Sequence, residues 1–369
     1  MSAQEDVRFL AKLVHRSHLS REEAEPLLPQ LKGGAALDSL LSRLPGWDDE
    51  RVDKMRRTEA GERPEIPGHE ILGTLGVGGT AEVFRARAKK SGQVLALKIL
   101  SAGYAKQPSE VNAFIEEARL LQRLDHSGLV KGYGPAKADG TYLSRMELVE
   151  GKTLLEYLDD GHLFDEEAAL RIVLEVAEVL SYMASEGLVH RDIKPGNIML
   201  SDSGRVKLID LGFCAEGGVC DSEGSARGTV QYLSPEQAEG GAAADLRSDI
   251  YALGVTLYQL TIGSLPFEGG DEDVLRAHVM ERLSSPELKS RGHSPHLHYF
   301  IEKMMSKDAE LRYQSWDEAL TDVREQVEGR QSLDFKAAAN KGRGRGRGVS
   351  ARGREGRSSG RSSGRGRRD

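Results

Sequence analysis

The chain has 369 residues, of which 38% are hydrophobic and 30% charged, as in globular proteins with enough apolar side chains for two or three cores. Its two cysteines are too few for a disulfide framework, and no run approaches the ~20 apolar residues that a membrane-spanning helix needs. Because Glu5, Asp6 and Arg8 interrupt the first ten residues, we expect no signal peptide and a cytoplasmic location.

The charge is distributed unevenly along the chain. The whole chain carries a formal charge of −7, but the segment 341–369 holds 11 basic residues against two acidic ones. That segment therefore carries +9, and the remaining 40 basic and 56 acidic residues carry −16. An acidic body and a basic tail are physically different objects and are expected to have different partners.

Residues 1–60 are expected to form a small helical module. Ser20 and Glu23 have the spacing of a capping box, and apolar residues recur at helical spacing on both sides of them. The module is either an extension that packs on the rest of the chain or a docking element for a partner. A linker rich in Gly, Pro and charged residues follows at 61–67.

From residue 68 the pattern changes to that of β-strands and leads into a glycine-rich turn. Glycines in such a turn let backbone N–H groups approach phosphate oxygens, because no Cβ stands in the way. Taken alone, the turn is also compatible with a dinucleotide-binding protein. The candidate nucleotide-binding residues here are Gly76, Val77, Gly78, Gly79, Thr80, Ala81 and Val83.

A single lysine, Lys98, stands inside the strand-like run 94–100. A cation in a buried strand needs an anionic partner, since an unpaired buried charge is very costly. The helical stretch 110–124 offers two candidates, Glu116 and Glu117.

The stretch 189–197, Val-His-Arg-Asp-Ile-Lys-Pro-Gly-Asn, brings Asp192, Lys194 and Asn197 into one short loop. This is the order and spacing that phosphoryl transfer from a metal nucleotide uses. The stretch closely resembles the catalytic loop of the eukaryotic-like, bacterial-type serine/threonine protein kinases. The resemblance implies that Asp192 is the base, Lys194 binds the γ-phosphate and Asn197 is a metal ligand.

The resemblance covers about residues 68–328 and implies an α+β, two-lobed protein kinase fold, with a β-rich N-lobe and a helical C-lobe. It implies that Lys98 pairs with Glu117 and contacts the α- and β-phosphates, and that Asp210, in an Asp-Leu-Gly tripeptide, binds Mg²⁺, with Mn²⁺ as an alternative. It also places the nucleotide against a strand and the hinge, where the backbone at 147 and 149 would bond adenine and the side chain at 150 would reach the ribose. These residues are Ala96, Met146, Glu147, Val149 and Glu150.

The segment after Asp210 resembles an activation segment. Its hydroxyl-bearing residues Ser222, Ser225 and Thr229 are candidate phosphorylation sites, with Thr229 the least favoured because it belongs to the substrate loop. In relatives with an Arg at the position of Arg191, that side chain captures a phosphate in this segment.

Three further positions are structural by the same resemblance. Glu236 is expected to pair with an arginine far downstream, Arg312, and Asp249 is expected to accept backbone N–H bonds from the catalytic loop. The pattern departs from the family at Ala81, Leu211 and Ser234, where the family has Gly, Phe and Ala.

The C-terminal segment 329–369 is expected to be disordered, since its Arg, Gly and Ser residues offer almost nothing apolar to bury. Its basic part lacks aromatic residues, which favours phosphate neutralisation over base stacking and makes nucleic acid one candidate partner. An acidic protein or the acidic body of this chain are the alternatives.

We therefore expect a serine/threonine protein kinase that uses Mg-ATP and acts on proteins, including itself. A small-molecule phosphotransferase shares the catalytic Asp and Asn but does not need Thr229, Glu236 and Asp249 together. A pseudokinase scaffold is disfavoured because every catalytic position is filled.

Overall fold

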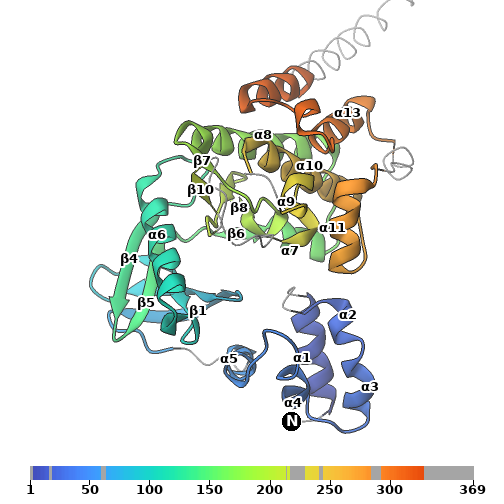
Figure 1. Ribbon diagram of the computed structural model, residues 1–369. Coiled ribbons are helices and arrows are strands. Elements are labelled where there is room, and N and C mark those ends of the chain that lie inside the picture. The colour runs from blue at the N-terminus through green and yellow to red at the C-terminus, as the bar shows by residue number, and fades with distance from the viewer. Residues whose placement is uncertain are drawn as a thin grey trace, which may run out of the picture. The chain divides into compact units, whose positions relative to one another are not determined.

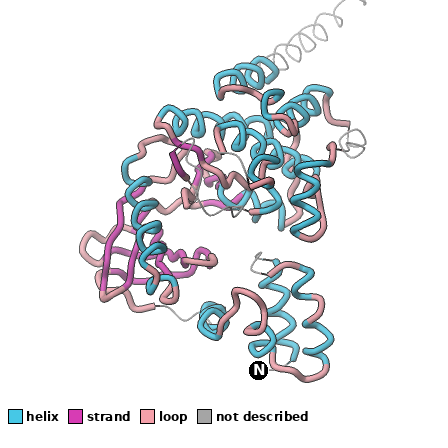
Figure 2. The backbone as a smooth tube through the Cα atoms, in the orientation of Figure 1, coloured by secondary structure: helices cyan, strands magenta, loops and turns pink. Residues whose placement is uncertain are grey.

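The structure is a computed structural model, shown in Figures 1 and 2. Its elements follow the chain as a group of helices, a mainly β lobe and a mainly helical lobe. The expected α+β fold with two lobes is thereby confirmed. The residues that the structure describes are 3–15, 19–59, 64–212, 214–216, 229–240, 244–283 and 292–327.

The N-terminal part consists of short helices with an apolar core of their own. Phe9, Leu13, Leu37 and Leu41 are buried there, as helical spacing predicts. The capping box at Ser20 is present, since the Glu23 N–H donates to Ser20 Oγ and the Ser20 N–H donates to Glu23 Oε2. The helices are α1 (Ala3–His15), α2 (Arg21–Ala24), α3 (Leu27–Lys32), α4 (Leu37–Leu41) and α5 (Asp49–Glu59).

The N-lobe is a five-stranded antiparallel sheet in the order β1-β2-β3-β5-β4, with α6 packed against β4 and β5 (Figure 1). Strand β3 is buried because it lies between β2 and β5, and its register places Lys98 beside Val83 on one side and Ser144 on the other. The elements are β1 (His69–Val77), β2 (Ala81–Ala88), β3 (Val94–Leu100), η1 (Tyr104–Lys106), α6 (Pro108–Arg123), β4 (Gly132–Ala138) and β5 (Thr141–Met146).

The C-lobe is built around α10 (Leu246–Ile262), which is apolar on nearly all sides and correspondingly buried. Gly254 lets α13 approach, because a Cβ at that position would lie 2.7 Å from the Cβ of Met304. The other helices are α7 (Leu154–Asp159), α8 (Glu166–Ser185), α9 (Pro235–Ala238), α11 (Asp271–Met280) and α13 (Pro295–Met304).

The C-lobe also contains short strands and 3-10 turns, which lie between its loops. Strands β6, β8 and β9 form one small sheet, and β7 pairs with β10. Their bounds are β6 (Gly151–Thr153), β7 (Leu188–Val189), β8 (Ile198–Ser201), β9 (Val206–Leu208), β10 (Ala215–Glu216), η2 (Pro195–Asn197), η3 (Val230–Tyr232) and η4 (Ala309–Leu311).

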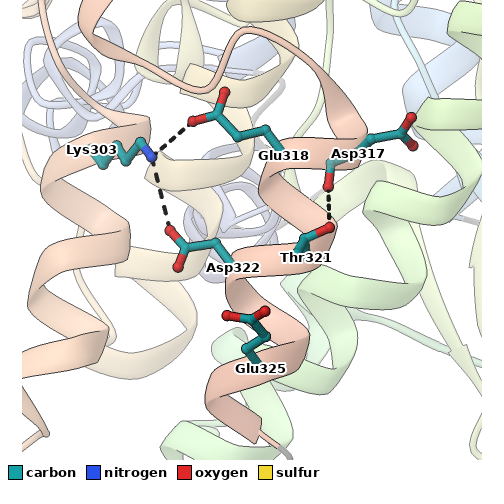
Figure 3. A pocket seen from close by; sticks show the side chains of 6 residues that line it. All are labelled: Lys303, Asp317, Glu318, Thr321, Asp322 and Glu325. Atoms are coloured by element: carbon teal, nitrogen blue, oxygen red, sulfur yellow. Dashed lines mark hydrogen bonds and ion pairs between the residues drawn. The ribbon is translucent and has the colours of Figure 1, made fainter.

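Helix α13 and the helix over residues 316–327 border a pocket lined mostly by acidic side chains (Figure 3). Lys303 Nζ lies 3.1 Å from Glu318 Oε1 and 3.9 Å from Asp322 Oδ2, so these charges are engaged with one another.

None of the helices in the described part of the chain is long and apolar enough to cross a membrane.

A buried ion pair ties α9 to the end of the C-lobe. The guanidinium of Arg312, whose side chain is 0% exposed, donates to both carboxylate oxygens of Glu236 at 2.8 Å. Its remaining N–H groups donate to the carbonyls of Ser306, Arg247 and Lys307, so all five donors are satisfied. Such a pair is costly to break from one side, because the other charge stays buried.

We therefore expect Glu236→Gln to remove part of the acid sensitivity of the fold. Burial by itself raises the pKa of Glu236, but the Arg312 guanidinium outweighs burial and lowers the pKa to about 2. A lowered folded-state pKa adds stability above the ordinary value of 4.5, and that stability is lost as the pH falls toward 2. The contribution is on the order of 3 kcal/mol in wild type.

Urea unfolding between pH 2.5 and 7 measures this contribution. Glu236→Gln should be destabilised at pH 7, and its loss of unfolding free energy on acidification should be smaller than that of the wild type. Glu239→Gln, a change at an exposed position at the end of the same helix, is the matched control and should follow the wild type. Parallel curves for wild type and Glu236→Gln would contradict the assignment.

Candidate active site

Three charged side chains from different elements meet between the lobes. Lys98 Nζ on β3 lies 2.6 Å from Glu117 Oε1 on α6 and 3.3 Å from Asp210 Oδ1. The side chains of Lys98 and Glu117 are only 14% and 15% exposed. Glu116, the other candidate for this pairing, instead lies on the exposed face of α6 and pairs with Arg119.

Burial and charge act in opposite directions on this triad. Burial lowers the pKa of Lys98, but Asp210 and Glu117 together outweigh it and raise that pKa above its ordinary value. Burial raises the pKa of Asp210, but Lys98 and the Gly212 N–H outweigh it and lower the pKa to about 2. The ammonium and the Asp210 carboxylate are therefore both charged at neutral pH, as binding phosphates and a cation requires.

The catalytic loop concentrates polar groups on the buried carboxylate of Asp192. Lys194 Nζ donates to Asp192 Oδ2 at 2.7 Å, and Asn197 Nδ2 donates to the same oxygen at 2.9 Å and to the Asp192 carbonyl at 2.8 Å. The Thr229 N–H and hydroxyl donate to Asp192 Oδ1 at 3.1 and 3.2 Å, and Lys194 Nζ also donates to the Thr229 hydroxyl. Asp192 thus links the catalytic loop to the segment at Thr229.

The backbone of the catalytic loop is held by hydrogen bonds to Asp249 on α10. Its two carboxylate oxygens accept the N–H groups of His190 at 2.8 Å and Arg191 at 2.7 Å. Arg191 has φ of +69°, a left-handed conformation that costs a non-glycine residue roughly 1 kcal/mol. The carboxylate therefore stabilises a strained backbone directly before Asp192.

The hinge begins at Met146, which is buried and pairs in register with Ala96 of β3. The Glu147 N–H donates to the Lys131 carbonyl at 2.8 Å, so only its carbonyl remains as a main-chain group for an adenine. The Glu147 carboxylate in turn accepts Lys207 Nζ from β9 at 2.9 Å and the Lys131 N–H at 3.1 Å. Lys207 carried no motif, so sequence reasoning missed this link between the hinge and the C-lobe.

Beyond Val149, the hinge ends at Glu150, which bridges to the opposite lobe. Arg85 Nη2 on β2 lies 2.7 Å from Glu150 Oε1, and both side chains are exposed. Arg85 shares its strand face with Val83, two residues earlier, because side chains alternate along a strand. Sequence reasoning did not pair these charges, since they lie 65 residues apart.

The glycine-rich turn connects β1, which ends with Gly76 and Val77, to β2. It is closed by a hydrogen bond from the Gly78 N–H to the Ala81 carbonyl at 2.8 Å, with Gly79 and Thr80 between them. Ala81, where the resembling family has glycine, buries its methyl group with Leu100 and Phe114. The substitution therefore adds an apolar contact at the base of the turn.

A divalent cation fits two of these side chains by donor chemistry. Asn197 uses its amide nitrogen on Asp192, which leaves the amide oxygen as a ligand, and Asp210 is ionised. Hard cations such as Mg²⁺ are bound through such oxygens together with substrate phosphates. Among the residues that the structure describes, no group of three or more His, Cys, Asp or Glu is placed to hold a metal ion alone.

Two candidate phosphorylation sites, Ser222 and Ser225, lie outside the described residues. The third, Thr229, is described, and its hydroxyl donates to Asp192 Oδ1. Arg191, the candidate receiver of a phosphate, lies at the base of the catalytic loop.

Comparison with known proteins agrees with this geometry. A family model described as protein kinase domain matches residues 69–323. The probable serine/threonine-protein kinase SCO3848 of Streptomyces coelicolor is 36% identical over 71% of this chain and 40% of its own length. PknB of Mycobacterium tuberculosis is 34% identical over 69% of this chain and 42% of its own length, and PrkC of Bacillus subtilis is 32% identical over 69% and 40%.

This chain spans about two fifths of the length of these curated relatives. The shared part is the two-lobed domain that holds Lys98, Asp192 and Asp210. With a family model that covers more than half of it, the chain belongs to the protein kinase family, among the bacterial-type serine/threonine kinases.

Proposed function

We propose that this protein transfers the γ-phosphate of Mg-ATP to serine or threonine hydroxyls of proteins. The observation that carries the proposal is the contact of Asp192 with both Lys194 and Thr229, because it brings a carboxylate, a cation and a substrate-loop hydroxyl to one point. The names of the relatives, which are serine/threonine-protein kinases, support the same acceptor class.

In this mechanism each side chain has one task. Lys98, held by Glu117, binds the α- and β-phosphates and positions the nucleotide. Asp192 accepts the proton of the acceptor hydroxyl, and Lys194 stabilises the transferring phosphoryl group. Mg²⁺, or Mn²⁺ in its place, would neutralise phosphate charge when bound by Asn197 and Asp210.

The rest of the nucleotide would lie against the hinge. We propose that the Glu147 carbonyl and the Val149 N–H bond the adenine edge, with Ala96, Met146 and Val83 as apolar walls. Glu150 would bond the ribose, for which it must share its carboxylate with Arg85. The turn over Gly76–Ala81 would cover the phosphates.

We propose four parts for the chain: a helical module at 1–60, a linker at 61–67, the kinase domain at 68–328 and a basic tail at 329–369. The helix and strand bounds and the family match over 69–323 support this division.

A reducing, cytoplasmic location is supported by the low number of cysteines.

We expect Asp192→Asn to fold normally, to bind Mg-ATP with wild-type affinity and to lose phosphoryl transfer. Removing a general base lowers the rate by about 10²- to 10⁴-fold without changing contacts to the nucleotide. The measurement is transfer from radiolabelled ATP to dephosphorylated casein, with calorimetric titration of ATP. Asp202→Asn, a change at an exposed position in the same lobe, is the control.

Three outcomes of this experiment discriminate the candidate functions. Transfer by the wild type to protein, lost in Asp192→Asn, supports the proposal. Transfer to small alcohols but not to protein would indicate a small-molecule phosphotransferase. Nucleotide binding without transfer by the wild type would indicate a pseudokinase.

We also expect autophosphorylation on Ser222 or Ser225 and less on Thr229, whose hydroxyl is engaged with Asp192. A phosphate there would form an ion pair with Arg191. Mass spectrometry of protein produced with and without Asp192→Asn gives the answer. An active wild type with no phosphate in residues 211–235 would contradict this expectation.

The basic tail is expected to bind polyanions, while the acidic body repels them. Shortening the chain to end at Asn340 removes the 11 basic residues of segment 341–369 and should abolish RNA binding at low salt. Full-length affinity should fall steeply with salt, by about 0.7 in the log-log slope for each phosphate neutralised on a single strand. Equal RNA binding by both forms would contradict this role, and a more active short form would indicate that the tail restrains the kinase body.

A further inference from the structure

One buried histidine lies between the acceptor segment and the core of the C-lobe. His278, on the last turn of α11, is 0% exposed and is bonded at both ring nitrogens. Its Nδ1 lies 2.9 Å from the hydroxyl of Tyr251 on α10, and its Nε2 lies 3.1 Å from the carbonyl oxygen of Gln231 in η3. The imidazole thus connects η3 with α10 through Gln231 and Tyr251, which are 20 positions apart in the chain.

The direction of each hydrogen bond in this chain follows from its two ends. A backbone carbonyl can only accept, so His278 Nε2 must carry the proton that it donates to Gln231. Lys307 Nζ can only donate, and it lies 3.2 Å from the Tyr251 hydroxyl oxygen. The Tyr251 O–H therefore donates to the unprotonated Nδ1, and His278 is held as one neutral tautomer.

The surroundings exclude a charged imidazole. Lys307 Nζ also donates to the carbonyls of Ala277 and His278, at 3.1 and 2.6 Å, and lies 4.5 Å from the centre of the Phe267 ring. Burial first, and the positive charge of Lys307 second, lower the pKa of His278 to about 4. A second proton on His278 would also leave it facing the Tyr251 hydroxyl with no acceptor for the hydroxyl hydrogen.

Gln231 is part of the substrate side of the site. It stands two residues after Thr229, whose N–H and hydroxyl bond the Asp192 carboxylate. The turn between them is closed by the Tyr232 N–H on the Thr229 carbonyl at 2.9 Å, and the Tyr232 hydroxyl bonds Gln259 of α10 at 2.6 Å. The segment is therefore bonded to the base at one end and to His278 in the middle.

We propose that His278 is a positioning residue for the protein acceptor: by donating to the Gln231 carbonyl, it fixes the segment 229–233 against which the acceptor polypeptide lies. This inference rests on the proposed kinase function, since the segment has a substrate only if the acceptor is a polypeptide. Because His278 touches neither the nucleotide-binding residues nor Asp192, its loss should affect the acceptor and not ATP.

Two substitutions separate the two ring nitrogens. In His278→Gln the side-chain amide nitrogen can take the place of Nε2 and still donate to Gln231. In His278→Asn the shorter amide can take the place of Nδ1 and accept from Tyr251, but the Gln231 carbonyl loses its partner. We expect KM for dephosphorylated casein to rise about tenfold in His278→Asn and about twofold in His278→Gln, since a buried acceptor left unpaired is costly. KM for ATP should stay within about twofold of wild type in both.

A second measurement does not depend on activity. Hydrogen–deuterium exchange of the peptide that contains Val230–Tyr232 should be about tenfold faster in His278→Asn than in wild type, and close to wild type in His278→Gln. Tyr251→Phe, which removes the hydroxyl that bonds Nδ1 and accepts from Lys307, should lie between them. His296→Asn, an exposed histidine on α13, is the control.

The outcomes are separable. Equal exchange and equal casein KM in the Asn and Gln variants would overturn the proposal, and so would a rise of the ATP KM as large as that of the casein KM. A wild type that transfers phosphate neither to casein nor to itself would contradict the proposed function, while the exchange rates would still decide whether His278 holds the segment. If His278→Asn does not fold, unchanged exchange in Tyr251→Phe overturns the proposal, and faster exchange supports it.

Discussion

The arrangement of the catalytic loop depends on one buried carboxylate. Asp249 lies on the central helix α10, and its two oxygens accept the N–H groups of the two residues that precede Asp192. Burial raises the pKa of such a carboxyl, and the two backbone donors act in the opposite direction by bonding its charged form. The same bonds hold Arg191 in a left-handed backbone that it would otherwise avoid.

Beside the catalytic loop that Asp249 holds, the site contains side chains from both lobes. The sheet supplies Lys98 and α6 supplies Glu117, whereas the C-lobe supplies Asp192, Asn197 and Asp210. The contact of Lys98 with Asp210 joins the two lobes electrostatically within the site. Because Lys98 and Asp210 are buried or half-buried, the charged form of each is stabilised by the other, and the loss of one changes the pKa of its partner.

The segment 229–233, which we propose faces the acceptor, is held mainly by hydrogen bonds from neutral groups. Thr229 bonds Asp192, and Gln231 bonds a neutral histidine that is oriented through Tyr251 and Lys307. The nearby ion pair of Glu236 with Arg312 fixes the helix that follows. This segment is thus held through both its main chain and its side chains, since the Thr229 and Tyr232 hydroxyls bond Asp192 and Gln259.

Much of the fold and the site could be read from the sequence, and the parts that could not share a physical reason. The motif from His190 to Asn197 could be recognised from the sequence because its residues lie within one short stretch, and their spacing is set by local backbone geometry. The resemblance favoured Glu117 over Glu116, and the structure supplies the physical reason: adjacent residues on a helix point about 100° apart, and the packing of α6 on the sheet turns Glu117 toward Lys98.

Contacts between distant residues without a motif were decided by packing. His278 is a single histidine on an amphipathic helix, and Lys207 and Arg85 are single cations on strands, so nothing in their neighbouring residues indicates a partner. Packing determines their partners. His278 bonds Gln231 because α11 packs against η3, Lys207 bonds Glu147 because β9 lies beside the hinge, and Arg85 bonds Glu150 because β2 lies opposite it. The sequence by itself determined which chemistry the loop could perform. The tertiary structure determined which buried groups hold that loop, the hinge and the segment 229–233. Only packing could do so, because it removes these groups from water and leaves each of them a single partner.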